Sequence, residues 1–151
     1  MNKKMSFVLT SCGRVDLLDR TLESFFKFNN YPLENLYLTE DSVDKNVYKK
    51  IDEKWGNKIN LLLNKRKKGQ IQSIVDVYKL IETPYVFHCE DDWIYNRRGF
   101  IRDSLKILEH DPKIIQVWLE SKDSASRLDI FSYGPLKKYK GIGFREVYCK
   151  E

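Results

Sequence analysis

A chain of 151 residues with 42% hydrophobic and 32% charged side chains has the size and composition of one folded domain, which excludes a disordered or fibrous protein. No run approaches the roughly 20 apolar residues of a membrane span, and no signal-peptide core follows the basic N-terminus, so we expect a cytoplasmic protein without a membrane span. The net charge of +5 fits a polyanionic partner. The basic runs at 65–68 and 137–140 are of a kind that is usually solvated, so we do not expect nucleic acid as that partner.

The first half of the chain alternates between strand-like and helix-like segments. A short apolar run at 6–10 predicts a strand, and apolar residues at helical spacing predict a helix that begins near Asp16 and ends before 29–32. A second strand is predicted at 36–39. A second helix carries apolar residues on one face and closes at Gly56; these residues are Val47, Ile51 and Trp55.

The same alternation continues in the second half. Strands are predicted at 59–63, 85–89 and 114–119, and a helix is predicted at about 100–110. A further amphipathic helix lies before Thr83-Pro84, and its apolar face is formed by Ile71, Ile74, Val75, Tyr78 and Ile81. Beyond Glu120 we expect loops and short pieces. The rhythm predicts an α/β fold in a single domain over 1–151, with a mostly parallel sheet covered by helices on both faces.

Polar or charged residues directly follow each of the first four predicted strands. They are 10–14, 40–42, Asn64 with the basic loop that follows it, and 90–93. In an open parallel sheet, ligands bind outside the carboxyl ends of the strands. We therefore expect a ligand site at this edge.

The acidic triplet Glu90-Asp91-Asp92 is the sharpest single signal at this edge. Three adjacent carboxylates repel one another, and a divalent cation such as Mg2+ or Mn2+ relieves that repulsion while leaving positions for phosphate oxygens. Alternation along a strand places Glu90 and Asp92 on one side, with Asp91 pointing away to cap the next turn. The alternative is a surface loop whose carboxylates pair with Arg97, Arg98 or Arg102.

These segments resemble those of a GT-A-fold glycosyltransferase of the family 2 type, and are similar to relatives in large DNA viruses. The run 7–14 resembles the family's first strand and its nucleotide-side loop, and 40–42 lies where the family has an acid that contacts the base. Gly69-Gln70 resembles the diphosphate-side loop. The run 85–92 resembles the strand that ends in the Asp-x-Asp motif, with Glu90 and Asp92 in its acidic places.

The resemblance implies a Rossmann-like GT-A domain that binds a nucleoside-diphosphate sugar, with UDP as the first choice of nucleotide. It implies transfer of the sugar to a glycan or other hydroxyl acceptor with Mn2+ or Mg2+ held by Asp92. The implied nucleotide-sugar contacts are Thr10, Ser11, Gly13, Arg14, Asp41, Gly69, Gln70, Glu90 and Asp91.

Several of these residues have a plainer alternative. Arg14 is either a diphosphate contact or a solvated loop arginine, and Gly69 is either a close-approach position or an ordinary turn glycine. Asp41 either contacts the base or ribose, or caps the helix that follows.

The catalytic base of such enzymes usually lies well beyond the metal motif. The acids that follow the motif closely enough to be considered are Glu120, Asp123, Asp129 and Glu146. GT-A domains are usually longer than this chain, so we expect the acceptor-side portion to be short or incomplete.

Two other classes of function remain open at this point. One is a non-catalytic nucleotide-binding α/β domain. The other is a metal-dependent phosphoryl-transfer or nuclease domain, which would have to work without a Walker-type glycine loop.

Overall fold

The structure is a computed structural model that describes residues 2–119 and 131–149. The chain divides into two compact units, Met1–Gly99 and Phe100–Glu151. The first unit carries every predicted nucleotide or metal contact. The expectation of a single domain over 1–151 stays a prediction.

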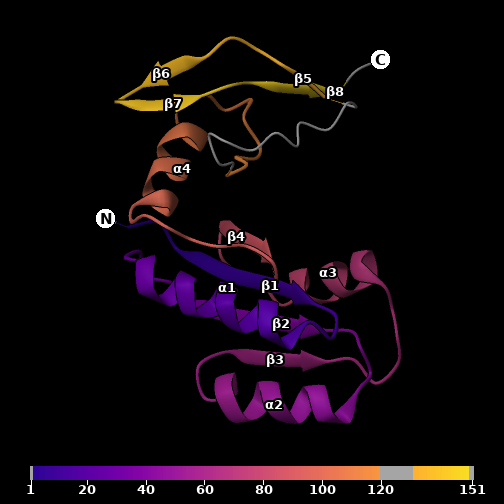
Figure 1. Ribbon diagram of the computed structural model, residues 1–151. Helices are drawn as coiled ribbons and strands as arrows, with labels where there is room; N and C mark the ends of the chain where they lie inside the picture. The colour runs from indigo at the N-terminus through magenta and orange to yellow at the C-terminus, as the bar shows by residue number, and fades with distance from the viewer. Residues whose placement is uncertain (1, 120–130, 150–151) are drawn as a thin grey trace. The chain divides into compact units, whose positions relative to one another are not determined.

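The first unit is built on a four-stranded sheet in the order β3-β2-β1-β4 (Figure 1). Its strands are β1 (Met5–Ser11), β2 (Asn35–Glu40), β3 (Asn60–Leu63) and β4 (Tyr85–Glu90). All three pairings are parallel, so the carboxyl ends of the strands meet at one edge. The predicted α/β fold with a parallel sheet is confirmed.

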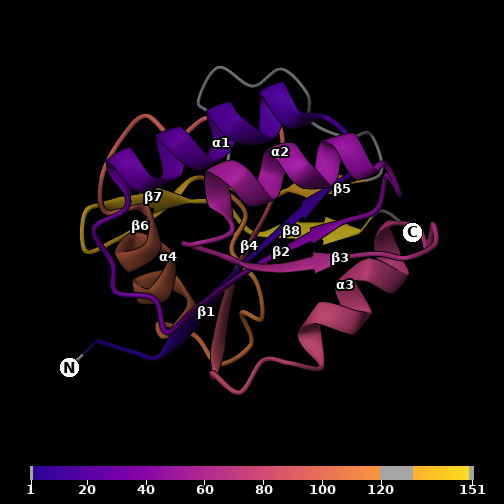
Figure 2. The same ribbon diagram turned by 90° about the horizontal axis from the view of Figure 1, so that it is seen from below.

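Helices cover both faces of this sheet (Figure 2). The helices α1 (Val15–Phe28) and α2 (Lys45–Trp55) lie on one face, and α3 (Gln70–Tyr78) lies on the other. The carboxylate of Asp44 starts α2 by accepting hydrogen bonds from the backbone N–H groups of Asn46 and Val47. No helix in the described part of the chain is long and apolar enough to cross a membrane.

The core of the first unit lies between β1 and α1. Every residue of β1 is buried, as expected for a central parallel strand. From α1, the predicted apolar face buries Leu18, Leu22 and Phe25. The ring of Phe25 lies 4.3 Å from Phe7 and 5.9 Å from Phe87 between centroids, so one helix residue joins two strands.

The predicted apolar face of α3 is wrong. The residues that α3 buries against the sheet are Ser73 and Val77, whereas Ile71 is 80% exposed. The helix also ends at Tyr78, before Ile81. Periodicity selects a set of apolar positions, but the side of the helix that meets the sheet is decided by how the preceding loop enters the helix.

The second unit contains α4 (Phe100–Leu108) and two small antiparallel sheets. One sheet pairs β5 (Phe131–Tyr133) with β8 (Val147–Cys149), and the other pairs β6 (Lys137–Tyr139) with β7 (Ile142–Phe144). These four short strands agree with the expectation of loops and short segments beyond Glu120.

The predicted strand at 114–119 is wrong, because this segment is irregular in the structure and Ile115 is 93% exposed. An apolar run of strand length forms a strand only where another strand's edge pairs with it. Within the described ranges, no strand pairs with this segment.

Replacing Phe25 with Ala should lower the free energy of unfolding by about 3–5 kcal/mol, because the change opens a cavity between β1, β4 and α1. The matched control is Phe26→Ala, since Phe26 is 38% exposed, and its loss should be less than half as large. Urea unfolding followed by circular dichroism measures both. Equal losses for the two variants would contradict this assignment of the core.

Candidate functional site

Buried carboxylates gather at the carboxyl edge of the sheet. Glu40 at the end of β2 is 0% exposed, Asp41 is 5% exposed and Asp91 after β4 is 1% exposed. A carboxylate taken out of water is costly unless donors or a positive charge surround it. The contacts of these three side chains therefore determine how the surrounding loops are held.

Asp91 is held from two directions. One of its oxygens accepts a hydrogen bond of 3.0 Å from the hydroxyl of Ser11, and the guanidinium of Arg14 binds both of its oxygens. The hydroxyl of Thr21 lies 2.8 Å from the backbone carbonyl oxygens of both Asp91 and Trp93. The turn after β4 is thus tied to β1, to the loop after it and to α1.

Arg14 carries the positive charge of this network. The hydrogen bond to Asp91 raises the pKa of Arg14 above its ordinary value. The negative charges of Asp91 and Asp92 raise this pKa further. Its Nη1 atom lies 3.2 Å from Oδ2 of Asp92. Arg14 is therefore the counter-charge for two of the three carboxylates, although its side chain is 48% exposed, and its predicted contact with a diphosphate stays a prediction.

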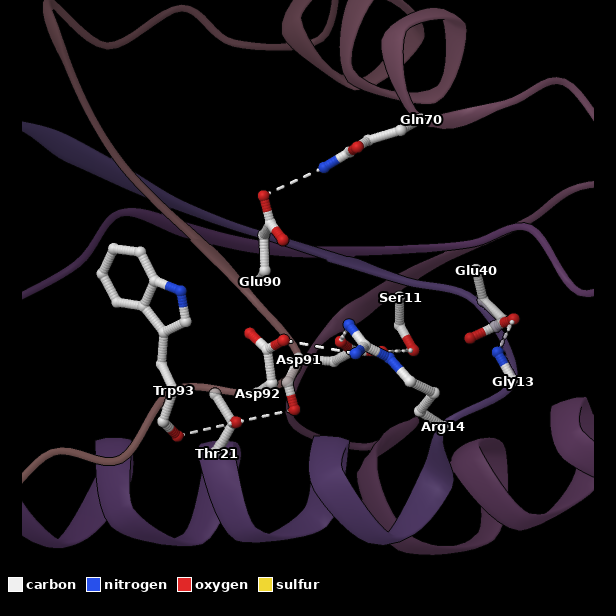
Figure 3. A network of polar contacts seen from close by, with 10 residues as sticks. All are labelled: Ser11, Gly13, Arg14, Thr21, Glu40, Gln70, Glu90, Asp91, Asp92 and Trp93. Carbon is white, nitrogen blue, oxygen red and sulfur yellow. Dashed lines mark hydrogen bonds and ion pairs between the residues drawn. The ribbon is translucent and has the colours of Figure 1, made fainter. Parts of the chain in front are cut away.

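The three acids of the triplet separate in space (Figure 3). Glu90 points toward α3, where its Oε1 accepts a hydrogen bond of 3.0 Å from the side-chain amide of Gln70. Asp91 and Asp92 both turn toward Arg14. The expectation that Glu90 and Asp92 lie on one side, with Asp91 pointing away, is therefore wrong. Asp91 and Asp92 lie together because Arg14 attracts both carboxylates.

Glu40 ties the loop after β1 to the loop after β2. Its Oε1 atom accepts hydrogen bonds of 2.8 Å from the backbone N–H groups of Gly13 and Ser42. Gly13 has φ of 78°, a left-handed conformation that favours glycine, and an added Cβ would lie 3.4 Å from Cβ of Ser42. Among the described residues, Oε2 of Glu40 has no hydrogen-bond partner.

Asp41 holds the basic loop that leads into α3. Its two oxygens accept hydrogen bonds from the backbone N–H groups of Lys68 (2.9 Å) and Gly69 (2.8 Å) and from the Asn64 amide (2.8 Å). Burial alone would raise the pKa of Asp41, but these hydrogen bonds outweigh it and keep the pKa below its ordinary value. The helix-cap alternative for Asp41 is wrong because Asp44 caps α2. The predicted contact with a base or ribose stays a prediction.

Two further predicted contacts lie at the same edge. Gly69 has φ of 82° and immediately precedes α3, so a left-handed conformation is required where the basic loop ends. Thr10 is the register partner of Glu90 across β1 and β4. Within the described part of the chain, its buried hydroxyl has no hydrogen-bond partner.

The acids considered for the catalytic base lie outside the described residues or in the second unit. Glu120, Asp123 and Asp129 lie outside the described residues. Glu146 belongs to the second unit, where its carboxylate lies 2.7 Å from the ammonium of Lys137. The base therefore stays unassigned.

An open hollow of about 360 Å3 lies beside the loop after β1. It is lined by residues 13–17 of that loop and the start of α1, and by Val47 and Lys50 of α2. The volume lies in the range of small-molecule sites, and Arg14 and Lys50 supply positive charge. Glu90 and Gln70 do not line it, so the hollow meets the acidic network only through Gly13 and Arg14.

A metal held by the protein alone is not supported by the geometry. Within 2–119 and 131–149, no group of three or more His, Cys, Asp or Glu residues is placed to hold a metal ion. The triplet offers open oxygens only on Glu90 and Asp92, because Asp91 is taken up by Ser11 and Arg14. A cation here would need further ligands from a bound molecule.

Sequence patterns did not single out Thr21 and Ser73, and they included Glu40 only as part of the run 40–42. Thr21 lies on the buried face of α1 between Leu18 and Leu22, and a polar residue on an apolar face is a detectable sign of a buried hydrogen bond. Glu40 lies opposite Ser11 in the pairing of β1 with β2, so the alternation of side chains along the two strands places both side chains on the same face of the sheet. The role of Ser73, which accepts a hydrogen bond from Asn64, has no such signal.

Comparisons with known proteins give the fold a context. No protein-family model matches the chain, and no curated protein matches it. Among solved structures, it is similar to the mannosyltransferase PcManGT from Pyrobaculum calidifontis in complex with GDP-Man and Mn2+, with a TM-score of 0.62 and 12% identity over 76% of this chain. It is also similar to S. aureus TarS (TM-score 0.56, 18% identity, 71% of this chain) and to TarS 1–349 in complex with UDP (TM-score 0.55, 20% identity, 71% of this chain).

These likenesses show a GT-A-like glycosyltransferase fold and nothing finer, because the identities are low. The matched region spans 34% of PcManGT, 20% of TarS and 32% of TarS 1–349. The similarity to enzymes of large DNA viruses stays a prediction.

Replacing Asp41 with Asn should destabilise the protein by about 1–3 kcal/mol at neutral pH, because a buried hydrogen-bond acceptor of the basic loop is lost. The folded pKa lies below the ordinary 3.8, so the carboxylate stabilises the fold above 3.8 and this contribution is lost as pH falls through the folded pKa. The stability difference between wild type and variant should therefore shrink on acidification. Urea unfolding at neutral pH and below pH 3.8 measures it, and a constant difference would contradict the role given to Asp41.

Proposed function

We propose that this protein is a metal-dependent glycosyltransferase that moves a sugar from a nucleoside-diphosphate sugar to an acceptor hydroxyl. The observation that carries the proposal is the pair of Arg14 and Asp92 at the carboxyl edge of a GT-A-like sheet, where Glu90 and Gln70 form a second polar pair. The same edge brings together the loops after all four strands of the first unit. A diphosphate needs this combination of positive side chains, backbone N–H groups and carboxylates that share a cation.

The nucleotide would lie along the ends of β1 and β2. Gly13 and Gly69 both adopt left-handed conformations there, and such turns allow close approach of a ligand to the backbone. Thr10 and Ser11 supply hydroxyl groups from β1. Asp41 acts by holding the loop at 68–69 in place, so its effect on nucleotide binding would be exerted through that loop.

The residues present fit a divalent cation that is shared with the donor. Asp92 has a side chain 42% exposed, and Glu90 is exposed; each has one oxygen bonded to a neighbouring side chain. The carboxylate of Asp92 suits Mn2+ or Mg2+ when phosphate oxygens and water complete the shell. A bound cation would stabilise the negative charge that develops on the departing diphosphate.

Arg14 and the basic loop would assist at the same point. Arg14 is half exposed, so its guanidinium can contact a phosphate while it remains bound to buried Asp91. The loop at 65–68 adds positive side chains at the N-terminal end of α3. Preorganised positive groups of this kind stabilise a leaving group more than the bound ground state.

UDP is our first choice of nucleotide, with GDP and dTDP behind it. One similar structure holds GDP-Man and another holds UDP, so both nucleotides are accommodated on this fold. The donor sugar and the acceptor would be decided by parts of the site beyond the nucleotide contacts.

A second candidate is a nucleotide-binding domain that uses no metal. The observation in its favour is that Arg14 already neutralises Asp91 and Asp92, which is the task given to the cation in the first proposal. In that case Arg14 would bind the diphosphate directly, and no sugar would be transferred.

Mn2+ and a nucleoside diphosphate should bind much more tightly together than either does alone, since the phosphate oxygens complete the cation's coordination. Replacing Asp92 with Asn should remove this synergy, because a neutral carboxamide lacks the negative charge with which a carboxylate binds a divalent cation. Isothermal titration calorimetry with UDP or GDP, with and without Mn2+, measures it. The control is Asp52→Asn, which changes an exposed carboxylate of α2. Equal nucleotide affinity with and without metal would favour the metal-free domain.

Release of free nucleoside diphosphate from a nucleotide sugar should separate an enzyme from a binding domain. Wild-type protein with Mn2+ should release it from one donor among UDP-, GDP- and dTDP-sugars, and Asp92→Asn should slow release by about 100-fold, as for loss of one transition-state charge contact. Mass spectrometry with added sugar acceptors distinguishes transfer from hydrolysis. Nucleotide binding without any release would contradict the enzymatic proposal.

A further inference from the structure

The helix α3 carries an exposed strip of large apolar side chains. Ile71 is 80% exposed, and Val75 and Tyr78 are each 42% exposed. Their spacing of i, i+4 and i+7 places them on one side of the helix. We call Ile71, Val75 and Tyr78 the α3 strip.

The strip is separate from both the buried side and the polar side of α3. The buried side is formed by Ser73 and Val77. The polar side carries Asp76, whose carboxylate binds the ammonium groups of Lys68 and Lys79. At 100° per residue the strip lies roughly opposite Ser73 and Val77 and well away from Asp76, so it is a third face of the helix. An exposed apolar face bordered by polar residues is typical of an interaction site.

Positive charge borders the α3 strip at its N-terminal end. The exposed side chains of Lys65, Arg66 and Lys67 come shortly before α3, whereas Lys79 after it is paired with Asp76. Lys68 has its charge taken up by Asp76, whereas the structure assigns no ion pair to the three residues before it among the described parts of the chain. An anionic membrane surface has lipid phosphates outside and hydrocarbon beneath. Basic side chains can bind the phosphates while the neighbouring apolar side chains enter the hydrocarbon.

We propose that the α3 strip and the basic residues 65–67 dock this protein on an anionic lipid surface. The apolar side chains would enter the boundary between headgroups and acyl chains, and the basic side chains would bind lipid phosphates. Tyr78 suits such a boundary because its ring is apolar and its hydroxyl is polar; the hydroxyl lies 2.9 Å from Nδ1 of His88. Docking requires no sugar transfer, but it shares the basic residues 65–67 with the proposed donor site.

Charge favours lipid over the other occupants of such a strip. A second copy of the chain, paired strip to strip with the two helices parallel, would bring two basic loops together, and like charges would repel. An antiparallel pair would separate the two loops and give the basic side chains no anionic partner. A soluble polyanion would bind residues 65–67 but would leave the apolar strip without a role. An anionic lipid surface satisfies both features at once.

Co-sedimentation of the full chain with vesicles tests the apolar part of the proposal. Wild-type protein should bind phosphatidylcholine vesicles that contain phosphatidylserine, and should bind pure phosphatidylcholine vesicles at least tenfold more weakly, by an order-of-magnitude estimate. The variant Ile71→Gln/Val75→Gln should bind the anionic vesicles about tenfold more weakly than wild type. Glutamine is a good helix former and both positions are exposed, so the fold is kept. The matched control is Ile115→Gln, because Ile115 is 93% exposed and lies outside α3.

A second variant tests the charge. Arg66→Gln/Lys67→Gln should weaken binding by about fivefold for each basic side chain removed, and added salt should reduce the difference. The control is Lys45→Gln/Lys49→Gln, which removes two exposed lysines from α2 instead.

Three results would overturn the proposal. The first is wild-type protein that does not sediment with anionic vesicles. The second is equal binding by wild type and Ile71→Gln/Val75→Gln, which would point to a purely electrostatic polyanion site. The third is a wild-type dimer in light scattering that the same variant converts to monomer, which would assign the α3 strip to a second copy of the chain.

Discussion

Water does not reach the carboxylates of Glu40, Asp41 and Asp91, so each one must find donors or a positive charge within the protein. The donors come from the loops that follow the strands. Glu40 binds backbone N–H groups at residues 13 and 42, Asp41 binds those at 68 and 69, and Asp91 binds Ser11 and Arg14. The cost of an unsatisfied buried carboxylate therefore holds every loop at this edge in one arrangement.

Buried and open acids have different tasks at the same edge. The buried acids accept hydrogen bonds from protein donors, with Oε2 of Glu40 as an exception among the described residues, and they organise the loops, whereas Glu90 and Asp92 are exposed. This division explains why three adjacent carboxylates are tolerated at the end of β4. Arg14 neutralises two of them, and the third points to the other side of the sheet (Figure 3). A ligand that contacted Glu90 and Asp92, as we propose for a diphosphate, would leave the hydrogen bonds of the buried acids in place.

The helix α3 links the candidate site to the proposed docking surface. Gln70 in its first turn reaches Glu90, while the next residue, Ile71, begins the exposed strip. Asp41 holds the loop that places both, since its carboxylate binds the backbone N–H groups of the two residues before Gln70. One buried carboxylate thus positions a predicted donor contact and an exposed apolar face together.

The sequence by itself determined the order of strands and helices up to residue 110 and the gathering of polar groups at one edge of a parallel sheet. Local periodicity and the direction of parallel strands are enough for that, because they depend on neighbours along the chain. Tertiary structure alone decided which side of α3 is buried, that 114–119 forms no strand, and that Arg14 pairs with Asp91 and Asp92. Each of these features depends on a partner distant in the sequence, which is a sheet face for α3, a strand edge for 114–119 and, for Asp91, an arginine 77 residues earlier. Local sequence patterns do not encode such a partner.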